Sequence, residues 1–275
     1  MSVAKTYDFE KRRITTQRLR EMKKSSTKIV CLTAYDAVMA RLFDEANVDV
    51  ILVGDSLGNT VQGNETTLAV TLEETIYHTK AVCKAAARSM VVADMPFMTY
   101  QVSPNEAFTN AGKIMKETGC NAVKLEGGKK VTEAIEKMTS FGIPVMGHLG
   151  LTPQSINQYG SYRARGTNPE EAQQIFDDAL ALQEAGVFSI VLEKIPAELG
   201  KRITEALKVP TIGIGAGPYC DGQILVYTDM LGLTVDFNPR FVRRYADLHT
   251  EIKKSVTQYG EDIRSNSFPT LKESY

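Results

Sequence analysis

The sequence predicts an α/β protein, a single-domain (β/α)8 TIM barrel. Short apolar runs rich in β-branched residues alternate along the chain with helical patterns, as expected for buried parallel strands joined by helices. The length of 275 residues is close to that of one eight-unit barrel. Polar residues follow nearly every predicted strand, and the first strand-to-helix turn lacks G-x-G-x-x-G. An open, doubly wound sheet is therefore the less favoured alternative.

Eight strands are expected, and each begins in an apolar run that ends near a glycine or a polar residue. They start at roughly Ile29, Val50, Met90, Ala122, Val145, Ser189, Thr211 and Ile224. We expect a helix, or a loop and a helix, after every strand except the last. The long connection 57–70 is typical of a lid or a binding loop.

Capping signals mark several of the helices between these strands. Thr71 with Glu74 three residues later is a capping box that begins a helix running to about Ala87. Ser103 followed by proline begins another, which Gly119 ends. The remaining helices are expected at 37–46, 130–140, 169–185 and 196–207.

The expected domain organisation is an N-terminal basic helical extension, 1–27, followed by the barrel and its C-terminal helices, 28–275. The extension contains basic residues interrupted by acidic ones, unlike an organelle transit peptide. These basic residues include Lys11, Arg12, Arg13, Lys23 and Lys24. We expect a solvated leading helix, with packing on a neighbouring subunit as one possible role.

Composition narrows the partners and the compartment. Thirty-two basic and 33 acidic residues give a net charge of −1, which favours small neutral or anionic metabolites over nucleic acid or an anionic membrane. No run approaches the roughly 18 apolar residues that span a bilayer, and the N-terminus lacks a secretory signal. The four cysteines are dispersed without a Cys-x-x-Cys pair, which predicts reduced thiols in a cytoplasmic protein.

Carboxylates follow three successive strands and form the strongest functional signal. Asp55, Asp94 and Glu126 stand at these ends, where the chemistry of barrel enzymes lies. If the three converge, they repel one another unless a hard cation such as Mg²⁺ or Mn²⁺ neutralises them. The alternative is that each caps a helix or forms an ion pair. Three in succession favour the metal site.

Three other ionisable residues have candidate roles at the same rim. Lys124 lies two residues before Glu126 and therefore on the same strand face, where we favour contact with a substrate carboxylate over a structural salt bridge. His148 is equally compatible with a substrate contact and with a hydrogen-bonded core histidine. Glu193 ends another apolar run and is a candidate general base, with helix capping or ion pairing as the alternative.

Six segments together carry a specific resemblance to a known family. They read VGDSLG from Val53, ADMPFMTY from Ala93, VKLEGG from Val123, GHLGLTPQS from Gly147, LEKIPAEL from Leu192 and IGIGAGPYCDGQILV from Ile212. In order and spacing they resemble the ketopantoate hydroxymethyltransferases over nearly the whole chain. The family resemblance implies a barrel enzyme that opens pantothenate synthesis and assembles as a decamer, so we expect a homo-oligomer.

The resemblance also implies residue roles and a reaction. It matches Asp55, Asp94 and Glu126 to the magnesium site, and Glu193 to the proton acceptor. The positions that match contacts to the 2-oxo acid are Asp55, Ser56, Asp94 and Lys124. The reaction implied is hydroxymethyl transfer from 5,10-methylenetetrahydrofolate to 3-methyl-2-oxobutanoate, giving 2-dehydropantoate through a Mg²⁺-stabilised enolate.

Two rival functions remain open from sequence. One is another magnesium-dependent barrel acting on 2-oxo acids, similar to a phosphonopyruvate or isocitrate lyase-like enzyme, although no catalytic cysteine or phosphonate-binding set is evident. The other is a noncatalytic barrel that binds nucleic acid through its basic N-terminal arm. Retention of the acidic strand ends argues against lost catalysis.

Overall fold

The computed structural model describes residues 13–275, which divide into two compact units, 13–225 and 226–275. The first unit is a closed barrel of eight parallel strands in sequential order, which confirms the predicted fold. Its strands are β1 (Ile29–Thr33), β2 (Val50–Val53), β3 (Met90–Asp94), β4 (Ala122–Glu126), β5 (Val145–Gly150), β6 (Ser189–Glu193), β7 (Thr211–Ile214) and β8 (Gly222–Leu225). The domain limits expected from sequence stay predictions.

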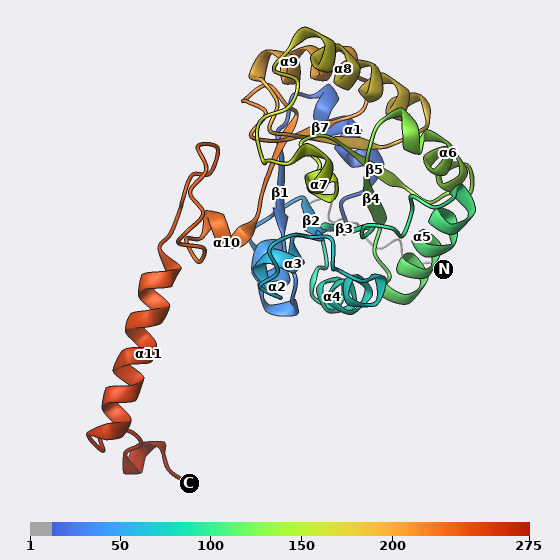
Figure 1. Ribbon diagram of the computed structural model, residues 1–275. Helices are drawn as coiled ribbons and strands as arrows, with labels where there is room; N and C mark the ends of the chain where they lie inside the picture. The colour runs from blue at the N-terminus through green and yellow to red at the C-terminus, as the bar shows by residue number, and fades with distance from the viewer. Residues whose placement is uncertain (1–12) are drawn as a thin grey trace, which may run out of the picture. The chain divides into compact units, whose positions relative to one another are not determined.

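Helices surround the barrel, with the strands at the centre (Figure 1). The main ones are α2 (Ala37–Glu45), α4 (Leu72–Ala85), α5 (Pro104–Thr118), α6 (Thr132–Ser140), α8 (Pro169–Glu184) and α9 (Ala197–Ala206). Shorter elements are α3 (Leu57–Thr60), η2 (Lys129–Val131), η3 (Pro153–Ser155) and α7 (Ile156–Tyr159). The capping box of α4 is present, and Gly119 ends α5 in the left-handed conformation, both as predicted.

One expected helix is absent from the described barrel. A loop, 215–221, connects β7 directly to β8, which corrects the prediction of a helix after every strand but the last. The loop sequence GAGPYCD contains glycines with positive φ at Gly215 and Gly217 and a proline that lacks a backbone donor, so a helix is disfavoured there.

The sequence predicts a solvated leading helix, but α1 (Thr16–Lys24) is partly buried. Its Leu19 and Met22, one helical turn apart, are buried in the same cluster as the inward side chains at the amino ends of the strands. Lys23 anchors the helix, because its Nζ donates to Asp221 Oδ2 at 2.7 Å and to the carbonyl of Thr204. Lys11 and Arg12 lie outside the described residues.

The second unit contains α10 (Tyr227–Met230), α11 (Leu248–Arg264) and η4 (Leu271–Glu273). Asp247 caps α11 by accepting from the Thr250 N–H. None of the helices in the described residues is long and apolar enough to cross a membrane. All four cysteines are free, as expected.

Candidate active site

Strand alternation places the predicted residues at the carboxyl end of the barrel interior. In β3, Met90 and Val92 belong to the interior apolar cluster, and Asp94 follows on the same face. In β4, Ala122, Lys124 and Glu126 are spaced two residues apart, so all three side chains lie on the face that lines the barrel interior. The predicted site residues therefore form the last layer of inward-facing side chains, at the carboxyl ends of the strands.

The register of neighbouring strands places acidic side chains next to basic ones. Asp94 is opposite Lys124, and Glu126 is opposite His148 on the next strand. Lys124 Nζ donates to Asp94 Oδ1 at 2.7 Å, and His148 Nδ1 lies 3.3 Å from Glu126 Oε1. Neighbouring parallel strands therefore account for both contacts directly.

Asp55 and Glu193 complete the group from either side. Asp55 lies two residues beyond β2, and its backbone N–H is 3.3 Å from Asp94 Oδ2. Glu193 Oε2 lies 3.4 Å from His148 Nε2, and only 18% of the Glu193 side chain is exposed. The β5–β6 approach that sets this contact needs Gly150, because a Cβ there would collide with the Glu193 carbonyl.

The predicted residues therefore meet at one mouth. Asp55, Asp94, Lys124, Glu126 and His148 are all buried. Ser56 lies at the edge of the group, where its hydroxyl is 2.8 Å from the Tyr35 hydroxyl.

Burial and crowding shift the ionisation of this group. Burial, followed by the charges of Asp94 and Glu126, raises the pKa of Asp55 to about 8. Burial also raises the pKa of Asp94, although Lys124 opposes the shift. Two buried acids are therefore held against ionisation, and a cation placed between them would reverse that effect.

The two basic groups remain charged near neutral pH. Burial would lower the pKa of Lys124, but Asp94, Glu126 and Asp55 together raise it. Burial and Lys124 would lower the pKa of His148, but contacts with Glu126 and Glu193 raise it to about 9. The mouth thus presents an ammonium and an imidazolium among four carboxyl groups, two of which are held against ionisation.

Sequence reasoning missed Gln154 and Tyr100, which are neutral but central to the geometry. Gln154 donates to Asp55 and Glu126, and the Tyr100 hydroxyl donates to Gln154 Oε1 at 2.7 Å. The signal available was a glutamine next to a proline, shortly after the strand that ends in His148 and Gly150. It carries no charge and so does not stand out.

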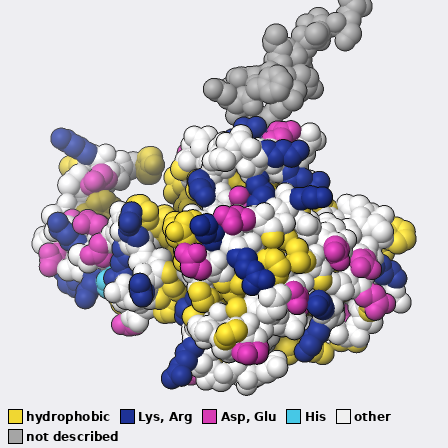
Figure 2. Space-filling view, turned by 90° about the horizontal axis from the view of Figure 1, so that it is seen from above, with side chains coloured by type: hydrophobic (Ala, Val, Ile, Leu, Met, Phe, Trp, Pro, Cys, Tyr) yellow, Lys and Arg dark blue, Asp and Glu magenta, His cyan; other side chains and the backbone are white. Residues whose placement is uncertain are grey.

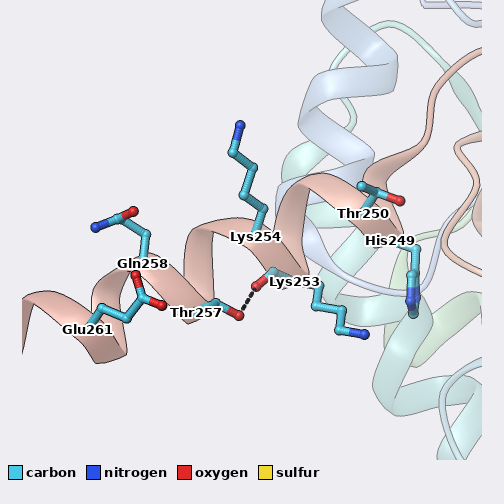
Figure 3. Close-up of a pocket in the computed structure, with 7 residues that line it drawn as sticks. All are labelled: His249, Thr250, Lys253, Lys254, Thr257, Gln258 and Glu261. Atoms are coloured by element: carbon cyan, nitrogen blue, oxygen red, sulfur yellow. Dashed lines mark hydrogen bonds between the residues drawn. The ribbon is translucent and has the colours of Figure 1, made fainter.

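A separate hollow lies on α11 in the second unit. It is lined by His249, Thr250, Lys253, Lys254, Thr257, Gln258 and Glu261 (Figure 3). All of these side chains come from one helix, and none is a strand-end residue. The surface of a single exposed helix does not enclose a ligand, so the hollow offers no alternative active site.

Fold and mouth together define an α/β-barrel enzyme with acid–base groups buried at the carboxyl ends of its strands. The chain belongs to the ketopantoate hydroxymethyltransferase family, whose model matches residues 13–271. A relative named 3-methyl-2-oxobutanoate hydroxymethyltransferase from Chlorobaculum tepidum is 58% identical over 95% of this chain and 96% of its own. A relative of the same name from Christiangramia forsetii is 54% identical over all of both chains. These findings support a hydroxymethyltransferase function in pantothenate synthesis.

Solved structures with a similar fold are far more distant in sequence. Phosphonopyruvate hydrolase in complex with oxalate and Mg²⁺ has a TM-score of 0.60 at 12% identity, covering 94% of this chain and 92% of that chain. A 2,3-dimethylmalate lyase has a TM-score of 0.58 at 14% identity, covering 94% and 91%. At this identity the likeness shows the barrel fold alone.

Proposed function

We propose that this hydroxymethyltransferase uses 5,10-methylenetetrahydrofolate and water to add a hydroxymethyl group to C3 of 3-methyl-2-oxobutanoate. The products are 2-dehydropantoate and tetrahydrofolate. The observation that carries the proposal is the buried cluster of Asp55, Asp94, Lys124 and Glu126, beside Glu193, in a chain whose relatives bear the name of this keto acid.

Magnesium is the cation proposed for this mouth, with Asp55 and Asp94 as ligands and Glu126 associated with them. Within residues 13–275 no three Asp, Glu, His or Cys side chains form a metal site unaided. Mg²⁺ is commonly held by only one or two carboxylates together with water and substrate oxygens. Glu126 Oε1 is buried and, apart from its 3.3 Å ion-pair contact with His148 Nδ1, has no hydrogen bond. The available ligands are hard oxygens, so the residues fit this ion. Bound Mg²⁺ would supply Lewis-acid stabilisation of negative charge developing on the 2-oxo oxygen.

The cationic side chains are proposed to receive the keto acid. Lys124, charged and buried, pairs with the substrate carboxylate while its contact with Asp94 holds it in place. His148 lies 3.4 Å from Lys124 Nζ and gives a polar contact to the same molecule. Asp55, Ser56 and Asp94 complete the proposed substrate site.

Glu193 is proposed to take the proton from C3. It enters the mouth from the far side of His148, whose Nε2 lies 3.4 Å from its carboxylate and orients it. A carboxylate held within hydrogen-bonding reach of a C–H beside a ketone is suited to general-base catalysis. The enolate so formed would attack the one-carbon unit of the folate.

We further propose that the enzyme works as a homo-oligomer in the cytoplasm, a decamer by family resemblance, without nucleic-acid or membrane partners. Lys/Arg and Asp/Glu side chains are interspersed over the face in Figure 2, so no single-sign patch there favours a polyanion.

The proposal is tested by incubating the protein with Mg²⁺, 3-methyl-2-oxobutanoate and 5,10-methylenetetrahydrofolate and measuring 2-dehydropantoate by mass spectrometry. We expect product only when all three are present. Turnover of phosphonopyruvate, isocitrate or 2,3-dimethylmalate instead would favour the rival barrel chemistry. No turnover of any of these would favour a noncatalytic barrel.

A further inference from the structure

Gln154 lies in η3, just beyond β5, and is only 5% exposed. Its backbone N–H donates to Glu126 Oε2 at 3.0 Å. Its side-chain Nε2 donates to Asp55 Oδ2 and to the carbonyl of Met95, both at 3.0 Å. One residue therefore contacts two of the three carboxylates through different parts of its structure.

The acceptor side of the same amide is also occupied. Tyr100 donates its hydroxyl proton to Gln154 Oε1 at 2.7 Å, and Gln101 Nε2 lies 3.2 Å from that oxygen. The Tyr100 oxygen in turn accepts the Glu126 N–H at 3.2 Å. An amide has two donor and two acceptor positions, and here all four are used.

Partner chemistry fixes the direction of this network. The Met95 carbonyl can only accept, so the NH₂ end of the Gln154 amide must face it. Asp55 lies on the same side of the amide as the Met95 carbonyl, so its carboxyl oxygen accepts from Gln154 Nε2. The opposite orientation would set two oxygens against the amide oxygen and leave the Tyr100 hydroxyl without its acceptor.

Backbone pairing alone does not set the relation between Asp55 and Glu126. Their strands, β2 and β4, are separated by β3. Asp55 also lies beyond the last residue of β2, outside the ladder of strand hydrogen bonds. Gln154 spans this separation from a third element.

Burying an amide is unfavourable unless its hydrogen bonds are made, and an apolar side chain would fill the same space at lower cost. A fully bonded glutamine in this position is therefore better explained by what it orients than by packing. Groups that hydrogen-bond to metal-binding carboxylates commonly set their geometry.

We propose that Gln154 is a positioning residue that holds Asp55 and Glu126 in the orientation required for divalent-cation binding, with Tyr100 fixing its amide. The inference rests on the proposed function.

The test uses full-length Gln154→Met, which keeps the side-chain length but removes the amide. Mg²⁺ binding is measured by calorimetry in the presence of 3-methyl-2-oxobutanoate, and C3 proton exchange with solvent is followed by NMR as Mg²⁺ is varied. We expect the half-saturating Mg²⁺ concentration to rise about 10- to 100-fold, the usual effect of losing such a partner. The exchange rate at saturating Mg²⁺ should stay within severalfold of wild type.

Two further variants sharpen the result. Tyr100→Phe should raise the half-saturating Mg²⁺ concentration less than Gln154→Met does. The double variant should show little more than Gln154→Met alone, because Tyr100 reaches the two carboxylates through the amide and its direct contact with Glu126 is to the backbone N–H. Gln174→Met is the matched control, since Gln174 also donates to a carboxylate, Asp178, but on the exposed surface of α8. It should leave the Mg²⁺ dependence unchanged.

Unchanged Mg²⁺ affinity in folded Gln154→Met would overturn the inference. A lower exchange rate with an unchanged Mg²⁺ midpoint would also overturn it, because that pattern marks a general structural defect. If Gln154→Met does not fold, Tyr100→Phe decides the matter by whether its Mg²⁺ midpoint rises. Wild-type protein without exchange would reject the proposed function and the inference with it, whereas normal wild-type exchange beside an unaffected Gln154→Met rejects the inference alone.

Discussion

The two ends of the barrel interior differ sharply although the same strands build both. At the amino ends, Met90 of β3 and Ala122 of β4 pack in a cluster that Leu19 and Met22 of α1 also enter. At the carboxyl ends, the same inward positions carry the charged layer that includes Asp94, opposite Lys124.

This contrast separates stability from chemistry along each strand. Apolar burial at the amino end is favourable at about 25 cal/mol per Å². Buried charges at the mouth cost desolvation that their mutual attraction only partly offsets, so they contribute weakly to stability. We infer that changes at the mouth chiefly alter catalysis and cation binding, and that changes at the amino end chiefly alter the free energy of unfolding.

The largest effect is expected at Glu193. Glu193→Gln preserves shape but removes the proposed base, so C3 proton exchange of 3-methyl-2-oxobutanoate should fall by about 10² to 10⁴. Calorimetry should show keto-acid binding close to wild type, and urea unfolding should be little changed. Exchange at the wild-type rate would contradict the assignment of Glu193 as base.

Asp94→Asn should come next and affect the cation. Loss of the proposed carboxylate ligand should weaken Mg²⁺ binding by more than about 100-fold, since even outer hydrogen-bond partners of metal ligands are worth about 10- to 100-fold. Calorimetric titration with Mg²⁺ measures this loss, and Asp177→Asn at a partly exposed position of α8 serves as control. Normal Mg²⁺ affinity in Asp94→Asn would remove Asp94 from the proposed site.

The sequence predicts the mouth well where its residues are charged and follow strands. Asp94 and Glu126 end apolar runs, and a barrel brings the carboxyl ends of all strands to one rim, so their convergence follows from topology. The sequence does not predict roles for Gln154 and Tyr100, because both are neutral. Their roles depend on hydrogen bonds that form only when the loops after the strands come together in the folded protein. No spacing rule along the chain links Gln154 to Asp55, 99 residues away.

At the amino end the sequence was less informative. The basic residues of α1 predict a solvated helix, whereas its two buried positions, Leu19 and Met22, decide where it packs. A stripe of two residues is too short to distinguish a packed helix from an exposed one. The sequence also predicts a loop and a helix before β8, whereas the structure has only a loop, whose glycines and proline disfavour a helix.

Leu19→Ala tests the stabilising role of the amino end. Leu19 is fully buried, so truncation should lower the free energy of unfolding by about 2 to 3 kcal/mol through lost apolar contact and a cavity. Urea unfolding measures the change, with exposed Arg20→Ala on the same helix as control. Mg²⁺ affinity of the folded variant should match wild type. A large loss of affinity would show that the two ends are coupled.

The smallest effect is expected at Asp44, near the amino end of β3. Its carboxylate accepts backbone hydrogen bonds from Ala87, Arg88 and Ser89. Partial burial would raise the pKa of Asp44, but these hydrogen bonds lower it overall. A folded-state pKa below the unfolded value of about 3.9 stabilises the protein above that pH, and the contribution is lost as pH falls through the folded-state pKa.

Asp44→Asn should therefore destabilise the protein by about 1 kcal/mol at pH 7, the scale of a net hydrogen-bond contribution. The difference from wild type should shrink in urea unfolding as pH falls below the unfolded-state pKa of about 3.9 and through the lower folded-state pKa. Glu45→Gln, at the exposed neighbouring position, controls for the loss of one negative charge. A deficit of equal size at both pH values would show that ionised Asp44 is not what holds this end of β3. Wild-type Mg²⁺ affinity in the variant would support separation of the two ends.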